Sequence, residues 1–156
     1  TLSVTDMKSL IIGGGNVYRN DDGVGILIVR KLKNRVSDYS RVKEQSGEGT
    51  SLMDAWSGYG RVCIVDAVSS GSPAGIIHRM DASSESIPAK FFSCSTHSFG
   101  VAEAIELART LGQLPSQLQL YGIEGGDFQP GEFLSAEVER VVESVVDEIV
   151  QYVSSS

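Results

Sequence analysis

The chain has 156 residues with 13 basic and 20 acidic side chains, which gives a formal net charge of −7. Apolar residues make up 41% of it and charged residues 21%, a composition that supports a folded core rather than a disordered chain. The acidic balance argues against a nucleic-acid partner, because such surfaces need clustered Lys and Arg. The length is that of one ordinary domain, so we expect a single domain over residues 1–156.

The sequence also indicates where in the cell the protein is expected. No stretch approaches the roughly 20 apolar residues that a membrane-spanning helix needs, so no membrane partner is expected. Residues 1–6 lack the charged and apolar regions of a signal peptide, and we therefore expect a cytoplasmic protein. Cys63 and Cys94 are expected to be reduced, since a chain of this size builds a core without a disulfide.

The first part of the chain alternates apolar runs with amphipathic segments. Residues 7–14 form a short apolar run closed by glycines, which predicts a buried strand. After a loop over residues 15–22, apolar side chains recur near a 3.6-residue period as far as Val36, which predicts a helix. A weaker strand over 41–45, a glycine-rich turn over 46–49 and a short helix over 51–56 follow.

The second part begins with the clearest central strand. Residues 61–68 are apolar almost throughout, as is typical of strands covered on both faces. A short strand over 76–80 follows, and apolar spacing predicts a helix from Ser98 that ends at Gly112. A last strand over 117–123, a loop over 124–133 and a final helix from about residue 135 complete the pattern.

Strands that alternate with helices predict an α/β protein. We expect a three-layer sandwich, with a mainly parallel twisted sheet of about five strands and helices on both faces. In such sheets, ligands bind beyond the carboxyl ends of the strands. The polar segments expected at that edge are the loop over 13–23, Asp66, residues 93–98, and Glu124 with Asp127.

Asp22, Asp66 and His97 are the strongest candidates among these residues. Two carboxylates and an imidazole make a three-ligand set with open positions for a first-row divalent metal. Each residue has a simpler explanation: Asp22 as a helix cap, Asp66 as an acceptor for loop amides, and His97 as an ordinary surface or hydrogen-bonded histidine. An aspartate near the end of an apolar strand favours the functional hypothesis, because burying an unpaired carboxylate is costly.

Nucleotide binding and serine chemistry fit the sequence less well. Gly13 and Gly15 follow a strand as in a dinucleotide-binding loop, but Tyr18 occupies the position of the third glycine. A tight turn with close packing is the favoured explanation for Gly13 and Gly14. No G-x-S-x-G sequence marks an activated serine.

The thiols and the second histidine also have simple explanations. Cys94 and His97 have the spacing of half a zinc site, but Cys63 is the only other thiol. Cys63 lies in an apolar strand, which favours a place in the core over metal binding. His78 lies in an alternating strand beside Arg79, and we expect it on the surface.

Taken together, these motifs resemble the hydrogenase maturation proteases, which remove a C-terminal extension from the large subunit of nickel-iron hydrogenases. The resemblance covers nearly the whole chain. It rests on four segments in matching order and spacing: residues 11–16 (IIGGGN), 21–25 (DDGVG), 62–67 (VCIVDA) and 96–98 (THS). It implies that Asp22, Asp66 and His97 bind a metal ion and carry the catalysis, so it indicates the same three residues as the chemical argument.

The resemblance further implies an aspartic-type endopeptidase that acts on a hydrogenase large-subunit precursor after nickel insertion. Nickel would be presented by the precursor and recognised by the ligands of the protease, and other divalent metals could occupy the site in vitro. A metal held by the three side chains could polarise the scissile carbonyl, activate water, or do both.

One turn departs from the family pattern. Many members carry Asp-Gly-Gly-Thr after the second strand, where this chain has Gly47, Glu48, Gly49 and Thr50. We assign substrate binding to Glu48, Gly49 and Thr50. The change leaves open a different substrate, or a non-proteolytic metal-dependent maturation or scaffold protein of the same fold. A related fold also occurs in the spore germination protease, so fold alone does not determine the substrate.

Overall fold

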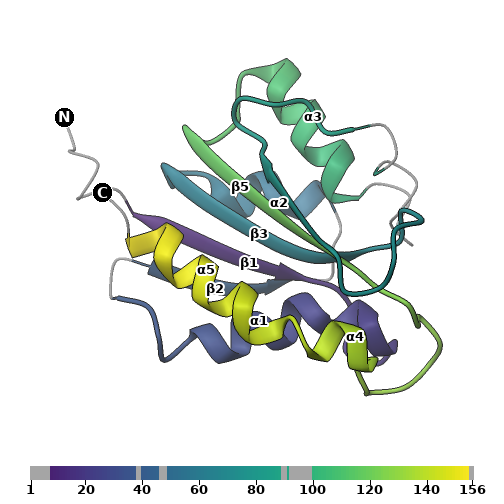
Figure 1. The fold of residues 1–156 in the computed structure, drawn as a ribbon. Coiled ribbons are helices and arrows are strands. Elements are labelled where there is room, and N and C mark those ends of the chain that lie inside the picture. Colours follow the sequence, from purple (N-terminus) through teal and green to yellow (C-terminus); the bar gives the residue numbers. More distant parts are fainter. Residues whose placement is uncertain (1–7, 38–39, 46–48, 89–90, 92–99, 155–156) are drawn as a thin grey trace.

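The computed structural model describes residues 8–37, 40–45, 49–88, 91 and 100–154. Within them, five strands form one sheet in the order β2–β1–β3–β5–β4 (Figure 1). The first four of these are parallel to their neighbours, and β4 runs antiparallel to β5. The mainly parallel sheet predicted from the sequence is confirmed. The strands are β1 (Ser9–Gly14), β2 (Ser40–Gln45), β3 (Arg61–Val68), β4 (Ile77–Asp81) and β5 (Gln117–Glu124).

Helices cover both faces of the sheet (Figure 1). On one face lie α1 (Val24–Leu32), which follows the 3₁₀ turn η2 (Asn20–Gly23), and α5 (Val142–Ser154). On the other lie α2 (Gly49–Trp56) and α3 (Val101–Leu111). A short helix, α4 (Ala136–Glu139), precedes α5. The predicted three-layer α/β architecture is therefore confirmed.

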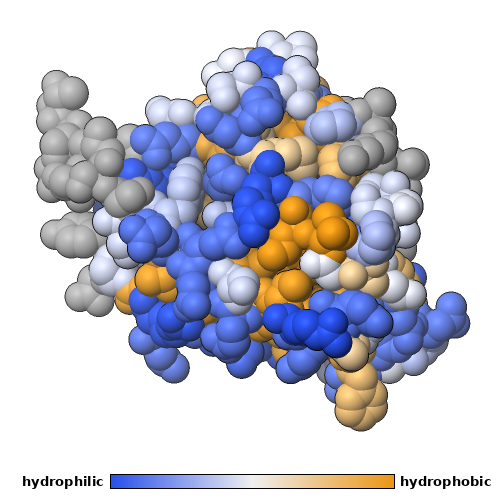
Figure 2. Space-filling view, viewed as in Figure 1, coloured by the Kyte–Doolittle hydropathy of each residue, from blue (hydrophilic) through white to orange (hydrophobic). Residues whose placement is uncertain are grey.

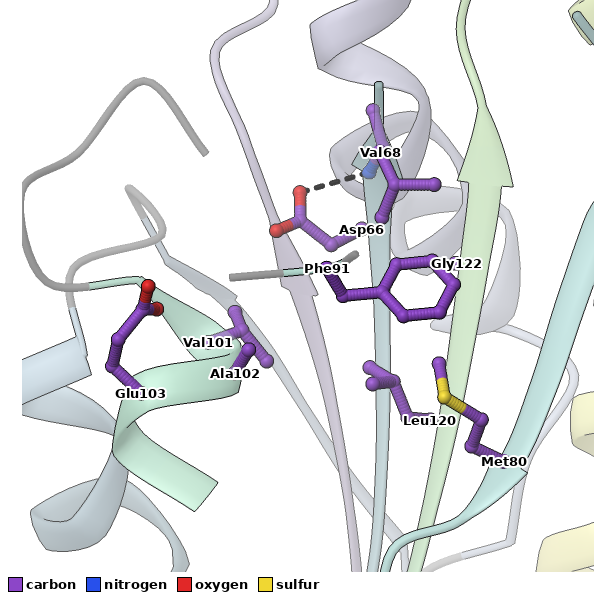
Figure 3. Close-up of a pocket in the computed structure, with 10 residues that line it drawn as sticks. Asp66, Val68, Met80, Phe91, Val101, Ala102, Glu103, Leu120 and Gly122 are labelled. Carbon is purple, nitrogen blue, oxygen red and sulfur yellow. Dashed lines mark hydrogen bonds between the residues drawn. The ribbon is translucent and has the colours of Figure 1, made fainter. Parts of the chain in front are cut away.

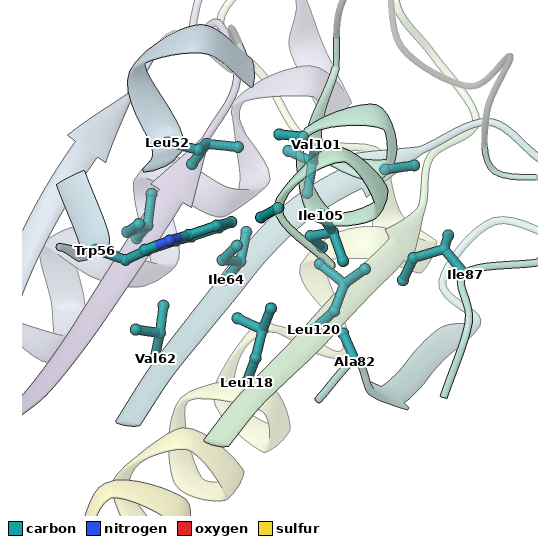
Figure 4. Packing of buried hydrophobic residues seen from close by; sticks show 14 of the residues in the cluster. Leu52, Trp56, Val62, Ile64, Ala82, Ile87, Val101, Ile105, Leu118 and Leu120 are labelled. Carbon is teal, nitrogen blue, oxygen red and sulfur yellow. The ribbon is translucent and has the colours of Figure 1, made fainter. Parts of the chain in front are cut away.

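The two cores follow from the alternation of side chains along the strands. In β3, Val62 and Ile64 face α2 and α3, whereas Cys63 and Val65 face α1 and α5. Figure 4 shows Trp56 of α2 packed over this row of strand residues. Because both faces are covered, the central strand is apolar at successive positions. Cys63 is a buried free thiol, as predicted, and burial raises its pKa.

Helix boundaries differ from the sequence expectations in two places. The first helix ends at Leu32 rather than Val36, although Val36 still packs against the core. The last predicted helix is divided into α4 and α5. At the division, the backbone N–H of Val141 donates to the carbonyl of Val138, three residues back, which is a 3₁₀ pattern that tightens the chain locally.

Helix α1 lies very close to β1 because glycines occupy the contact. A β-carbon on Gly13 would lie 2.7 Å from the Cγ atoms of Val29 and would collide with the carbonyl oxygen of Gly25. A β-carbon on Gly25 would lie 2.6 Å from the carbonyl oxygen of Gly14 and would collide with that of Val65. The close packing predicted for Gly13 is confirmed, and a side chain at either glycine would push α1 off the sheet.

Ion pairs join α1 and α5 at the surface. Lys31 and Arg35 lie 3.3 and 3.6 Å from the carboxylate of Glu143, and Arg35 lies 2.8 Å from that of Asp147. Figure 2 shows this face as mainly hydrophilic, with a hydrophobic patch near its centre. Exposed pairs contribute little, so the docking of α5 depends on its buried valines and isoleucine. Across the described parts of the chain, no helix is long and apolar enough to cross a membrane.

Arg61 fixes the end of α5 against the start of β3. It is buried, and its Nη1 donates to the carbonyl oxygens of Tyr152 and Val153 at 3.3 Å. Its Nε donates to Oε1 of Gln117 at 2.9 Å. The guanidinium also lies over the ring of Tyr152, 5.6 Å from its centre. Carbonyls at a helix C-terminus lack partners within the helix, so this cation satisfies them.

The substitution Gly25→Ala tests the glycine contact. We expect it to lower the free energy of unfolding by about 2 kcal/mol or more, because the added carbon meets backbone atoms that cannot move aside. Urea denaturation measures the change. Ser144→Ala, at an exposed position of α5, is the control and should change stability by less than about 0.5 kcal/mol. A Gly25→Ala protein as stable as the wild type would contradict the close approach.

Candidate functional site

The candidate site lies at the carboxyl edge of the parallel strands, where β1 and β3 end side by side. The glycines at the end of β1 pack against the side chain of Asp66 and the backbone of Asp22. A β-carbon on Gly14 would lie 3.3 Å from the carboxyl carbon of Asp66. Gly15 has φ +129°, and a β-carbon there would collide with the carbonyl oxygen of Asp22 and lie 3.8 Å from Oδ1 of Asp66. The glycine loop therefore brings the backbone against both acids.

Asp66 lies near the end of β3, and its side chain is on the face of the sheet that carries α3. Its Oδ1 accepts a hydrogen bond from the backbone N–H of Ala67 at 2.9 Å (Figure 3). Burial, reinforced by the negative charge of Asp22, raises the pKa of Asp66 to about 7, although the Ala67 N–H acts in the opposite direction. A carboxyl group that titrates near neutral pH can both hold and accept a proton under physiological conditions.

Asp22 is placed by the 3₁₀ turn η2. Its Oδ2 accepts a hydrogen bond from the backbone N–H of Asn16 at 3.1 Å, and Asn16 in turn accepts one from the N–H of Tyr18 through its Oδ1 at 2.9 Å. The N-cap residue of α1 is Gly23, and no side-chain hydrogen bond caps the start of this helix. Both predicted acids adjoin Gly15, and the negative charge of Asp22 helps to raise the pKa of Asp66.

Other predicted site residues fall outside what the structure describes. His97 and Glu48 are outside the described residues, as is Cys94. The backbone of Gly49 and Thr50 begins α2, directly after β2 at the same sheet edge as Asp22. The described residues alone contain no cluster of three His, Cys, Asp or Glu side chains able to hold a metal. Asp22 and Asp66 supply hard oxygen donors of the kind a divalent cation takes, and His97 remains a predicted ligand.

Asp21 has a structural role that was not predicted from the sequence. It is fully buried and accepts hydrogen bonds from the N–H groups of Gly126 (2.8 Å), Asp127 (3.0 Å) and Ser135 (2.7 Å), and from the Ser135 hydroxyl (2.8 Å). It thereby ties the loop before α1 to the loop after β5. The available signal was the Gly-Gly pair at 125–126, because glycine-rich loops offer N–H groups to an anion.

Glu124, expected at the edge where ligands bind, is instead part of the framework. Its side chain is buried and accepts hydrogen bonds from Ser70, through the backbone N–H at 2.7 Å and the hydroxyl at 2.5 Å. Nε2 of His78 lies 3.0 Å from the same carboxylate. The expectation of a surface His78 is wrong: its side chain is only 13% exposed. The reason is that Glu124, 46 residues away in sequence, supplies its partner.

The raised pKa of Asp66 predicts a pH dependence of stability that Asp66→Asn removes. Ionising Asp66 is harder in the folded than in the unfolded state, so its contribution to the stability of the wild type falls as pH rises from about 4 to about 7. The Asn side chain has no such cost. Relative to the wild type, the variant should gain about 2 kcal/mol between pH 5 and pH 8. Urea denaturation with a chelator present measures this, and parallel stability profiles would contradict it.

Asp21→Ala tests the connection between the two loops. Three backbone N–H groups and the Ser135 hydroxyl would lose their acceptor, so we expect a loss of roughly 2–4 kcal/mol in stability. Amide hydrogen exchange at Gly126, Asp127 and Ser135 should accelerate far more than in β1. Asp54→Ala, at an exposed position of α2, is the matched control. Unchanged exchange in the loop after β5 would contradict the assigned role of Asp21.

Comparison with known proteins gives consistent matches over most of the chain. Hydrogenase 2 maturation protease of Escherichia coli (strain K12) is 27% identical over 149 residues, covering 92% of this chain and 89% of that protein. The hydrogenase expression/formation protein HoxM of Cupriavidus necator is 28% identical over 145 residues, covering 90% of this chain and 69% of that protein.

Solved structures agree. An endopeptidase from Escherichia coli, solved in solution, superposes with a TM-score of 0.81 at 27% identity, over 93% of this chain and 91% of that one. The hydrogenase maturating endopeptidase HybD from E. coli shares the fold with a TM-score of 0.79 at 24% identity, over 94% and 91% of the two chains. The family model described as hydrogenase maturation protease matches residues 26–152. With a matching sequence over most of its length and the same fold, the chain belongs to the hydrogenase maturation protease family.

Proposed function

We propose that the protein is a processing endopeptidase that removes the C-terminal extension of a nickel-iron hydrogenase large-subunit precursor after nickel insertion. The observation that carries the proposal is the pair of acids, Asp22 and Asp66, held against the glycine loop at the carboxyl edge of the sheet. The names of the relatives support a hydrogenase precursor as partner, since they are called hydrogenase maturation or formation proteins.

Nickel enters this proposal as part of the substrate. Asp22, Asp66 and His97 would be its ligands on the protease side, since carboxylate oxygens and imidazole suit a first-row divalent ion. Three ligands leave positions open, and side chains of the precursor would fill them. When bound, such an ion supplies Lewis-acid polarisation of a neighbouring carbonyl. Other divalent metals would compete for the same donors in vitro.

The acids of the chain itself supply the proton chemistry. Two neighbouring carboxylates favour sharing one proton, because their like charges oppose double ionisation. Before the nickel-loaded precursor binds, Asp66 holds that proton near neutral pH; it loses the proton when it ligates the ion, and its ionised form can take one from water. Asp22 is oriented by the N–H of Asn16. This division of roles corresponds to an aspartic-type endopeptidase.

The proposal also assigns the residues that contact the substrate and the compartment in which the protein acts. Glu48, Gly49 and Thr50 would contact the precursor, because the start of α2 follows β2 at the edge where Asp22 lies. Glu48 would take the part of the aspartate found there in other members. A cytoplasmic location fits the reduced Cys63 in the core.

A cleavage assay on purified precursor, followed by mass spectrometry, tests the proposal. With nickel-loaded precursor and metal-stripped protease, we expect loss of the C-terminal extension; with nickel-free precursor, we expect little or none. Asp22→Asn, Asp66→Asn and His97→Ala should each slow cleavage by at least about 100-fold, because each removes a ligand or a proton carrier.

Cys94→Ser serves as the control and should retain most of the activity. Rapid cleavage of nickel-free precursor would contradict recognition of nickel but not proteolysis. Loss of activity in Cys94→Ser with His97→Ala tolerated would indicate thiol chemistry instead. Binding of the loaded precursor without any shortening would favour the alternative, a non-proteolytic maturation or scaffold protein.

A further inference from the structure

An apolar pocket opens beside Asp66 on the face of the sheet that carries α3, with about 430 Å³ of empty space when the open solvent at its mouth is counted. Figure 3 shows Val101 and Ala102 of α3 on one side of it, and Phe91, Leu120 and Met80 on the other, with Asp66 at one end. The pocket is thus bounded by the helix, by strands β4 and β5, and by the candidate site. None of the chemistry described so far uses it.

The pocket adjoins the apolar core on this face of the sheet. Five of its lining residues belong to the same apolar cluster as Ile64 and Ile105, which are 0% exposed. Met80, Phe91, Val101, Ala102 and Leu120 instead keep between 6% and 9% of their surface exposed. Apolar side chains that leave surface uncovered side by side form a place where a further apolar group can bind.

A glycine within the sheet contributes to this pocket. Gly122 of β5 is paired with Asp66 of β3 on one side and with His78 of β4 on the other. A β-carbon there would lie 3.2 Å from Cγ1 of Val68, so even a methyl group would crowd the pocket wall. Glycine inside a strand weakens the sheet and often marks a position where another group approaches closely.

The wall of the pocket that Phe91 forms is held in place before any ligand binds. The rings of His78 and Phe91 meet edge to face with their centres 5.0 Å apart. Since His78 is also bound to the buried Glu124, Phe91 packs against a fixed neighbour. On the opposite side, the carboxylate of Glu103 accepts a hydrogen bond from the N–H of Gly100 at 3.1 Å, which secures the start of α3. A preformed wall lowers the entropy cost of binding.

We infer that this pocket binds an apolar side chain of the substrate polypeptide, from a residue that directly flanks the cleaved bond. The inference rests on the proposed function. A chain that presents its scissile bond to Asp66 brings the neighbouring side chain to the mouth of the pocket. The carbon-lined walls offer nothing to a polar side chain, and the carboxylates of Asp66 and Glu103 at the rim repel an acidic one.

The first test varies the substrate. In the nickel-loaded precursor, each of the two residues that flank the cleaved bond is replaced in turn by Leu, Ala, Asp and Lys, and kcat/KM is measured by mass spectrometry. At one of the two positions, Leu should exceed Ala by about tenfold and Asp by more. Equal rates for all four residues at both positions, or a preference for Lys at both, would overturn the inference.

The second test varies the pocket. Ala102→Leu fills it, so the preference for Leu over Ala in the substrate should disappear or reverse, whereas Met80→Ala widens it and should admit Phe. Ala136→Leu, the same change at an exposed position of α4, is the matched control and should keep the wild-type preference. Circular dichroism checks folding, and Met80→Ala carries the test if Ala102→Leu does not fold. An unchanged preference in the folded pocket variants would overturn the inference.

A binding measurement separates this inference from the proposed function. If the wild type cleaves no hydrogenase precursor, the proposed function fails. The pocket is then tested separately, by titrating a peptide that spans the start of the C-terminal extension of the precursor into protein labelled at methyl groups. Shifts at Met80, Val101 and Leu120 that disappear when the flanking apolar residue becomes Asp would support the pocket. Shifts that are absent, or that persist with Asp, would overturn it.

Discussion

The buried carboxylate of Asp21 is the interaction on which the candidate site depends. It accepts four hydrogen bonds from residues 126–135, so it holds two loops that are more than 100 positions apart in sequence. Because Asp21 points into that loop, the next residue along the tight η2 turn is directed elsewhere, within electrostatic range of Asp66. One acid gives the turn its fixed shape, and the adjacent acid belongs to the candidate site.

Among the described residues, three acids that lie wholly or partly inside the fold differ in how well their hydrogen-bonding capacity is satisfied. Asp21 accepts four hydrogen bonds, and Glu124 accepts two from Ser70 and faces His78. For Asp66, the described residues provide one hydrogen bond, from the adjacent Ala67, and a like charge nearby. A satisfied carboxylate stabilises a fold, whereas one that is poorly satisfied and near another acid is costly to keep and is typical of functional sites. This contrast, rather than burial alone, sets Asp66 apart.

Much of the fold was predictable because it depends on local patterns. Apolar runs and a 3.6-residue period located the strands and most helix ends, and an acid within the apolar strand of residues 61–68 identified Asp66. The parts that were missed depend on distant partners: adjacent Asp21 and Asp22 look equivalent in sequence, and His78 is covered only because Glu124 reaches it. The pocket was also hidden, since it arises where Gly122 lies between two strands. His97 and Glu48 stay predictions, because they lie outside the described residues.

The attachment of α5 by Arg61 has a practical consequence for handling the protein. Arg61 begins β3, so the helix ends at the amino edge of the sheet, and β1 starts at that same edge. The described chain therefore begins just before β1 and ends in α5 on this side of the sheet, away from the carboxyl edge where Asp22 and Asp66 lie (Figure 1). A tag, a surface linker or a fused partner attached on this side would therefore lie away from both acids. Protein immobilised on this side would keep the edge that carries Asp22 and Asp66 turned away from the support.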